Sequence, residues 1–268
     1  MANHASDFVM GQPGNSTKAP GHWVLARLGK KVLRPGGIEL TKQMLQSLAI
    51  GKDDDVVEFA PGLGATARLT LHRSPRSYVA IERDERAATT VRRLLTEPRQ
   101  RCILGRAEQT GLDDQCASVV YGEAMLTMQS QSAKSRIIAE AARLLAPDGR
   151  YGIHEIALIP DEINAETAAQ ICSDLSGAIH HSVAPLTLAG WRETLSQHGF
   201  SVCVERKSPM HLLEPCRLLT DEGFGGAMRF AWNLLRDTKS RERVMKMRSV
   251  FRKYESHLAA ISLTCRKM

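Results

Sequence analysis

The stretch VVEFAPGLGATARL, residues 56–69, decides the fold. An apolar run carrying one carboxylate, Glu58, leads directly into a turn with glycines at positions 62 and 64, and a helix-like segment follows. Because glycine has no side chain, the backbone of such a turn can be approached closely by another molecule. The pattern predicts a buried strand, a tight turn and the start of a helix, with a ligand lying over the turn.

Strand-like and helix-like segments alternate after this turn. Strands are predicted at SYVAIER, RCILGRA, CASVVYGEAML and GRYGIHEIAL, and helices at DERAATTVRRLLTE and SAKSRIIAEAARLLAP. Such helical connections are long enough for right-handed crossovers, which place helices on both faces of a parallel sheet. The sequence therefore predicts a doubly wound α/β fold.

The composition is typical of a soluble globular protein, with 268 residues of which 43% are hydrophobic and 24% charged. No segment reaches the roughly 18 consecutive apolar residues that a transmembrane helix requires, and the N-terminal residues have no apolar core of the signal-peptide type. The six cysteines are dispersed without a CxxC pair, so no metal site and no disulfide framework is predicted. We therefore expect a cytoplasmic protein with reduced thiols.

The positive charge gathers near the C-terminus. The net charge is +7, and the residues from Arg229 onward contain 11 Lys and Arg against 3 Asp and Glu. The segment TKSRERVMKMRSVFRKYESHL predicts a helix with an apolar stripe on one face and basic side chains on the other. A solvated face, a surface for an anionic substrate or membrane headgroups, and a nucleic-acid contact all remain open. The absence of a recognisable RNA-binding module disfavours the last.

The class of ligand follows from a second carboxylate. Glu82 ends the strand after the glycine turn, where a carboxylate can accept hydrogen bonds from both hydroxyls of a ribose. The glycines alone do not separate a nicotinamide dinucleotide from other nucleosides, because Ala67 is tolerated at the third glycine position. Glu58 would repel a pyrophosphate but not an ammonium or sulfonium group. A ribose-bearing ligand with such a cation is therefore predicted.

The segments EFAPGLG, AIERD, GRAEQTGLDD and ARLLAPDGRYGIHE together resemble the class I S-adenosylmethionine-dependent methyltransferases. The sequence is similar to the small-molecule enzymes related to ubiquinone and menaquinone biosynthesis, over about residues 40–205. The resemblance implies a Rossmann-like, mostly parallel sheet of seven strands, the last two being FSVCVERK and HLAAISLTCRK, with the final strand antiparallel.

The resemblance also implies S-adenosyl-L-methionine as cofactor, S-adenosyl-L-homocysteine as product, and a set of binding residues. Two positions depart from the family pattern: Arg106 replaces an aspartate that many relatives direct at the adenine amino group, and a proline at position 61 replaces a small residue or cysteine. The implied cofactor-binding residues are Glu58, Ala60, Pro61, Gly62 and Gly64 for the methionine part, Glu82 for the ribose, Arg83, Ala107 and Glu108 for the adenine, and Gly122, Glu123 and Met125 near the transferable methyl.

Methyl transfer from a sulfonium is an in-line displacement, so positioning and exclusion of water can supply most of the rate acceleration. A general base is needed only for weakly acidic acceptors, and His154 is the candidate, with a polar lining or core histidine as the alternative. Its neighbour Glu155 points to the opposite side of an extended segment. The residues proposed to line an acceptor pocket, with a plain apolar core as the alternative, are Trp23, Glu155, Phe224, Met228 and Trp232.

The expected organisation has five parts. They are a flexible N-terminus (1–20), an N-terminal helical lid (21–50), the cofactor-binding core (51–208), a helical insertion or lid with the basic helix (209–256) and the last core strand (257–268). The predicted function is methyl transfer to a small, apolar organic acceptor. An NAD(P)-dependent oxidoreductase and an RNA-binding or RNA-modifying protein are the alternatives. Peripheral membrane contact and a homodimer are left open.

Overall fold

The computed structural model describes residues 20–31 and 34–268. The expected flexible segment 1–20 falls almost wholly outside this range, as do residues 32 and 33 of the expected lid. The division of the remaining residues into a lid, a core and an insertion stays a prediction.

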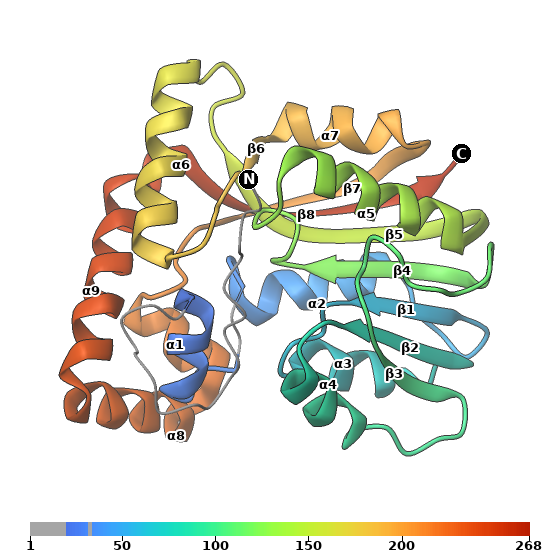
Figure 1. Ribbon diagram of the computed structural model, residues 1–268, viewed down its shortest axis with the longest axis horizontal. Helices are drawn as coiled ribbons and strands as arrows, with labels where there is room; N and C mark the ends of the chain where they lie inside the picture. Colours follow the sequence, from blue (N-terminus) through green and yellow to red (C-terminus); the bar gives the residue numbers. More distant parts are fainter. Residues whose placement is uncertain (1–19, 32–33) are drawn as a thin grey trace, which may run out of the picture.

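A single twisted sheet runs through the described residues, in the order β3-β2-β1-β4-β5-β8-β7, with the short strand β6 paired to the end of β5 (Figure 1). All neighbouring strands are parallel except β8, which is antiparallel to both β5 and β7. The predicted mostly parallel sheet with an antiparallel last strand is confirmed, and β6 is an addition to it. The strands are β1 (Asp55–Phe59), β2 (Ser77–Glu82), β3 (Gln100–Leu104), β4 (Ala117–Glu123), β5 (Leu145–Leu158), β6 (Leu186–Thr187), β7 (Phe200–Pro209) and β8 (Leu258–Lys267).

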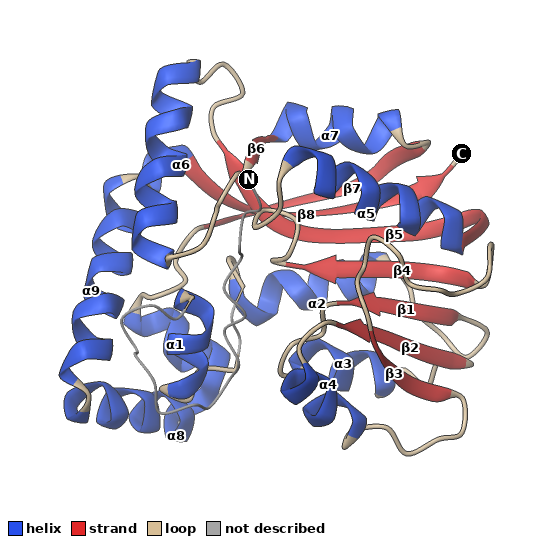
Figure 2. Cartoon of the chain, in the orientation of Figure 1, coloured by secondary structure: helices blue, strands red, loops and turns tan. Residues whose placement is uncertain are grey.

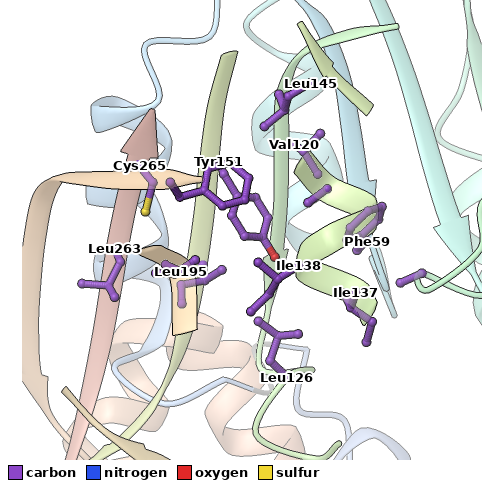
Figure 3. Close-up of a cluster of buried hydrophobic side chains, with 14 of the residues drawn as sticks. Phe59, Val120, Leu126, Ile137, Ile138, Leu145, Tyr151, Leu195, Leu263 and Cys265 are labelled. Atoms are coloured by element: carbon purple, nitrogen blue, oxygen red, sulfur yellow. The ribbon is translucent and has the colours of Figure 1, made fainter. Parts of the chain in front are cut away.

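Helices cover both faces of this sheet, as the predicted crossovers require (Figure 2). On one face α5 (Gln131–Leu144) and α7 (Leu188–Gln197) bury Ile137, Ile138 and Leu195 against the strands, with Phe59 and Tyr151 contributed by the sheet (Figure 3). On the other face lie α2 (Gly37–Ser47), α3 (Ala65–Leu71) and α4 (Glu85–Arg92). The strand order reverses between β1 and β4, which is where doubly wound sheets bind ligands beyond the carboxyl ends of their strands.

A second helical layer lies beyond the carboxyl end of β4 (Figure 1). It contains α1 (Gly21–Arg27), α6 (Ala165–Ile179), α8 (Pro215–Arg236) and α9 (Thr238–Lys253), followed by the short 3-10 turn η1 (Glu255–His257). These helices share an apolar cluster of their own, separate from the two clusters on the sheet. Its members include Leu25 of α1, Leu175 of α6, Phe230 of α8 and Met247 of α9. The layer thus forms a roof over one edge of the sheet.

A buried ionic contact attaches the segment between α1 and α2 to α8. Lys30 Nζ lies 3.2 Å from Asp221 Oδ2 and 3.8 Å from Glu222 Oε1, and all three side chains are nearly inaccessible to solvent. Burial lowers the pKa of Lys30, and the two carboxylates oppose that effect. Directly after them Gly223 takes φ 69° and ψ 171°, so α8 is two helices joined at a kink. The contact ties Lys30, just after α1, to α8.

Candidate functional site

The glycine turn after β1 leaves one surface open. Gly62 has φ 56° and Gly64 has φ 74°, values that favour glycine. A Cβ atom on Gly62 would meet no atom within 4 Å, whereas one on Gly64 would lie 2.6 Å from Leu94 Cδ1. The two glycines therefore have different roles: Gly62 lets another molecule approach, and Gly64 allows α3 to lie close to the residues after α4.

Glu82, at the end of β2, lies beside this turn. Its Oε2 accepts from the backbone N–H of Gly62 at 3.0 Å, and its Oε1 accepts from the N–H groups of Arg83 and Asp84 at 2.9 and 3.0 Å. Burial raises the pKa of this carboxyl, while the three backbone donors oppose the rise. The structure thus places Glu82 in direct contact with the glycine turn, the two features from which a ribose-bearing ligand was predicted.

Glu58 lies beneath the glycine turn, and its side chain is buried. The hydroxyls of Tyr78 and Tyr121 donate to its Oε2 at 2.5 and 2.7 Å, and Tyr121 also contacts Thr70 of α3 at 2.6 Å. Burial raises the pKa of Glu58 to about 7, against the opposing effect of the two hydroxyl hydrogen bonds. One oxygen of this carboxylate is therefore used to join β1, β2 and β4 under α3.

A buried polar cluster occupies the switch point between β1 and β4. Arg34 Nη1 donates to Glu123 Oε2 at 2.8 Å and to Thr66 Oγ1 at 2.5 Å, and Thr41 donates to Glu123 Oε1 at 2.6 Å. Burial alone would raise the pKa of Glu123, but Arg34 and the neighbouring His154 outweigh it and lower this pKa to about 2. The carboxylate of Glu123 therefore serves as an ionised centre that holds the cluster together.

His154 is part of this cluster and is completely buried. Its Nδ1 lies 2.8 Å from Glu123 Oε1, and its Nε2 donates to the backbone carbonyl of Pro35. Because both ring nitrogens are engaged, neither is available to take a proton from an acceptor. These contacts favour the alternative of a core histidine, which positions Glu123 and Pro35, over the catalytic role.

Arg34 is a residue that the sequence analysis missed. It is 8% exposed, and its Nε and Nη2 atoms are buried without a hydrogen-bond partner in the described part of the chain. Buried guanidinium groups are normally satisfied, so two orphaned donors indicate a place for an oxygen-rich anion. The signal in the sequence is an arginine directly before Pro-Gly-Gly, in a segment expected to cover the ligand.

The other predicted cofactor residues lie at the ends of β2, β3 and β4 or in the loops that follow. Ala107 is buried, Arg83 is exposed, and Glu108 is held by Arg106 Nε at 2.7 Å. Carboxyl ends of parallel strands share one edge of the sheet, so these residues lie along the edge where this fold is expected to have its ligand crevice. The remaining predicted positions in this crevice are Ala60, with φ 51°, Pro61, which is buried, Gly122, packed on Met125, and Met125 itself.

An apolar cavity of about 70 Å³ lies under the helical roof, next to the polar cluster. Pro35 lines the cavity and accepts the hydrogen bond from His154, so the two features share a wall. Apolar side chains from four elements of the roof and the sheet form most of the lining. They include Leu25 of α1, Ile156 of β5, Ile179 of α6, Met210 after β7, and Met247 and Phe251 of α9.

Glu155 lines this cavity but is fully engaged by a neighbouring loop. Its oxygens accept from the N–H groups of Met125, Leu126 and Thr127 and from the Thr127 hydroxyl, at 2.6 to 3.0 Å. Burial raises its pKa, and these donors oppose the rise. Glu155 therefore shapes the loop after β4 instead of offering a free carboxylate.

The proposed acceptor-pocket residues on α8 lie at the surface of the protein. Phe224, Met228 and Trp232 are 76, 57 and 60% exposed and do not line the cavity, whereas Phe230 of the same helix is buried. Helical spacing identifies a stripe of apolar side chains but does not say which side of the helix meets the protein. Trp23 of α1 is half-buried. The residues of that helix that line the cavity are Gly21 and Leu25.

The described residues contain neither a candidate metal cluster nor a candidate membrane-spanning helix. No group of three His, Cys, Asp or Glu side chains there is arranged to hold a metal ion. No helix of residues 20–31 and 34–268 has the length and apolar character to cross a membrane.

Comparisons with known proteins agree with this geometry. A methyltransferase domain family matches residues 57–153. An uncharacterized protein of Haemophilus influenzae is 30% identical over 251 residues, which covers 92% of this chain and 98% of the relative.

Solved structures share the fold at low sequence identity. The MccD protein gives a TM-score of 0.69 at 18% identity, covering 88% of this chain and 99% of its own. The cyclopropane synthase MmaA2 from Mycobacterium tuberculosis gives 0.68 at 15% identity, covering 91% and 94%. The mycolic acid cyclopropane synthase CmaA1, solved with SAH and CTAB, gives 0.63 at 18% identity, covering 86% and 84%.

Proposed function

Because the chain belongs to the class I S-adenosylmethionine-dependent methyltransferases, we propose that it transfers a methyl group to a small, predominantly apolar acceptor held in the cavity under the helical roof. The observation that carries this proposal is the contact between two unlike sites. Pro35 borders both: its carbonyl accepts from His154 of the polar cluster, in which two Arg34 nitrogens have no partner among the described residues, and Pro35 also lines the apolar cavity.

The residues around the crevice fit the cofactor. The free Nε and Nη2 of Arg34 suit the carboxylate of its methionine part, and Glu82 suits the two ribose hydroxyls. The open side of Gly62 admits the close approach of a ligand to the backbone. Arg83, Ala107 and the other residues after β2 and β3 would border the adenine. When bound, the cofactor supplies an electrophilic methyl group on a sulfonium.

The chain contributes position and exclusion of water rather than proton transfer. The apolar lining from Leu25, Ile156 and Met247 would desolvate an acceptor and hold it in one orientation. Among the described lining residues Glu155 and Thr127 carry polar side-chain oxygens, and the Thr127 hydroxyl donates a hydrogen bond to Glu155. We therefore expect an acceptor atom that is nucleophilic at neutral pH without an enzymatic base.

Calorimetry with S-adenosylhomocysteine and with NADH tests the cofactor class directly. We expect S-adenosylhomocysteine to bind at micromolar concentrations and NADH to give no heat. Binding of NADH alone would favour the oxidoreductase and overturn the proposal. Transfer of radiolabelled methyl from S-adenosylmethionine into pools of apolar small molecules then identifies the acceptor, with water-soluble pools of equal complexity as the comparison.

The RNA alternative loses its main support in the structure. Arg248 and Arg252 of the basic helix both pair with Glu214, and Lys253 pairs with Asp174 at 2.8 Å. Three of the seven Lys and Arg residues of α9 thus form ion pairs within the described chain, and the inward apolar stripe is packed in the roof.

We also propose that the protein works in the cytoplasm. All six cysteines are free, and Cys102 and Cys265 are buried as thiols. Reduced thiols are typical of proteins in that compartment. Cell fractionation with an antibody against the protein tests this placement, and recovery in an extracellular or periplasmic fraction would contradict it.

A further inference from the structure

The outward side of α8 carries an unusual concentration of exposed apolar side chains. The described chain has eight large hydrophobic residues that are strongly exposed, and five of these eight lie on α8. Single exposed hydrophobic residues are normal on a protein surface, but several of them on one helix indicate a binding surface. The five residues, which we call the α8 stripe, are Leu219, Phe224, Met228, Trp232 and Leu235.

The stripe belongs to a helix that is firmly attached on its other side. Phe230 is 3% exposed in the apolar cluster of the roof, and Asn233 Nδ2 donates to the Leu28 carbonyl at 3.1 Å. After the kink at Gly223, the positions 224, 228, 232 and 235 recur at intervals of four, four and three residues, so they share one helix face. The helix thus buries one side and presents the other, at the outer edge of the molecule (Figure 1).

Positive charge borders the stripe. Arg229, Arg236 and Lys239 are exposed, and the guanidinium of Arg236 lies 5.7 Å from the centre of the Trp232 ring. Between positions 223 and 236 there is no acidic residue, and Asp237, which follows, pairs with Arg27 at 2.8 Å. The surface is therefore apolar in its middle and cationic along its border.

We propose that the α8 stripe docks onto the surface of an anionic lipid bilayer, with Phe224 and Trp232 entering the interface and the bordering cations facing lipid headgroups. Amphipathic helices with aromatic and aliphatic side chains on one face and Lys and Arg beside them bind membranes in this way. Indole rings favour the boundary between headgroups and acyl chains. A second copy of the chain is a poorer partner, because a two-fold contact would bring together two surfaces that both carry the exposed cations Arg229, Arg236 and Lys239.

Vesicle sedimentation tests the proposal on the full-length protein. We expect the wild type to sediment with vesicles of phosphatidylcholine mixed with phosphatidylglycerol, and less with phosphatidylcholine alone or at high salt. The double variant Phe224→Ser/Trp232→Ser should lower the partition coefficient at least about tenfold, since each ring buries apolar surface on docking. The matched control is Leu104→Ser, which changes an apolar side chain of 49% exposure on β3 and should bind vesicles like the wild type.

Two further measurements make the result decisive. Wild-type tryptophan emission should shift to shorter wavelength with anionic vesicles, and Trp232→Ser should lose that shift. All variants should keep the wild-type affinity for S-adenosylhomocysteine, which shows that they are folded. The proposal is overturned if the wild type does not bind anionic vesicles or if the double variant binds as well as the wild type. It is also overturned if light scattering shows a dimer that the double variant breaks while vesicle binding is unchanged.

Discussion

Arg34 and Glu123 form an ion pair of 2.8 Å, between Nη1 and Oε2, in the interior of the molecule at the end of β4. The pair links the segment before α2 to the point where the strand order reverses. It uses only one of the guanidinium nitrogens, and Nε and Nη2 stay buried without a partner in the described residues. Since an unsatisfied buried donor costs about 1–3 kcal/mol, we expect a ligand that accepts hydrogen bonds to complete this cluster.

Replacing Arg34 by glutamine should weaken binding of S-adenosylhomocysteine at least about tenfold, because a charged hydrogen bond to the ligand carboxylate is lost. The same variant should keep its affinity for 5′-methylthioadenosine, which has the nucleoside but no amino-acid carboxylate. Calorimetry with both ligands measures the two effects. Lys31→Gln, an exposed change on the same segment, is the control and should leave both affinities unaltered. Equal losses for the two ligands would mean that Arg34 acts only by holding the fold.

Glu82→Ala should weaken binding of both ligands by about tenfold or more, since both contain the ribose that the carboxylate is proposed to hold. The variant also removes the acceptor for the N–H groups of Gly62, Arg83 and Asp84. We therefore expect a loss of about 1–3 kcal/mol in the free energy of unfolding, with the fold retained. Ligand titration and urea unfolding measure these changes. Wild-type affinity in a folded Glu82→Ala protein would rule out the ribose contact.

The fold was predictable because its signals are local. The alternation of strand-like and helix-like segments predicted the parallel sheet, and the resemblance correctly implied that β8 runs antiparallel. Glu82 could be identified because its place at a strand end is a property of the sequence around it. Its contact with Gly62 then follows from the parallel pairing of β1 with β2.

Features that depend on tertiary partners were not predictable in the same way. The stripe containing Phe224 and Trp232 was recognised, but its orientation depends on which side of α8 meets the roof. His154 lies in β5, near the end of the sheet where catalytic residues are common, yet its ring nitrogens bond to Glu123 and to the Pro35 carbonyl, 119 positions away. Arg34 was missed because its role appears only when the segment before α2 folds over the crevice.

The acceptor cavity can be narrowed without touching the cofactor crevice. Ile179 is half-buried at the end of α6 and lines the cavity, so Ile179→Phe should intrude into it with a loss of about 1–3 kcal/mol in stability. We expect the KM for the acceptor to rise about tenfold while the affinity for S-adenosylhomocysteine is unchanged. Steady-state kinetics and calorimetry separate the two, and Ile179→Val is the control. A changed cofactor affinity with an unchanged acceptor KM would contradict the assignment of the cavity.

Glu58 should make stability depend on pH in a direction opposite to that of most carboxylates. Burial raises its pKa from 4.5 to about 7 in the folded protein, so the native state keeps a proton that the unfolded chain releases. The stabilisation from this proton is complete below pH 4.5 and is lost as the pH rises through about 7. A shift of this size corresponds to about 3 kcal/mol.

Glu58→Gln should remove that dependence, because an amide has no proton to lose while its oxygen can still accept from Tyr78 and Tyr121. Relative to the wild type, the variant should therefore gain up to about 3 kcal/mol in the free energy of unfolding between about pH 4.5 and pH 8. Urea unfolding followed by circular dichroism at the two pH values measures the gain. Glu85→Gln, which changes an exposed carboxylate on α4, should show no comparable gain. If both variants follow the wild type in parallel, Glu58 is ionised in the native protein across the whole range, and its two tyrosine partners outweigh its burial.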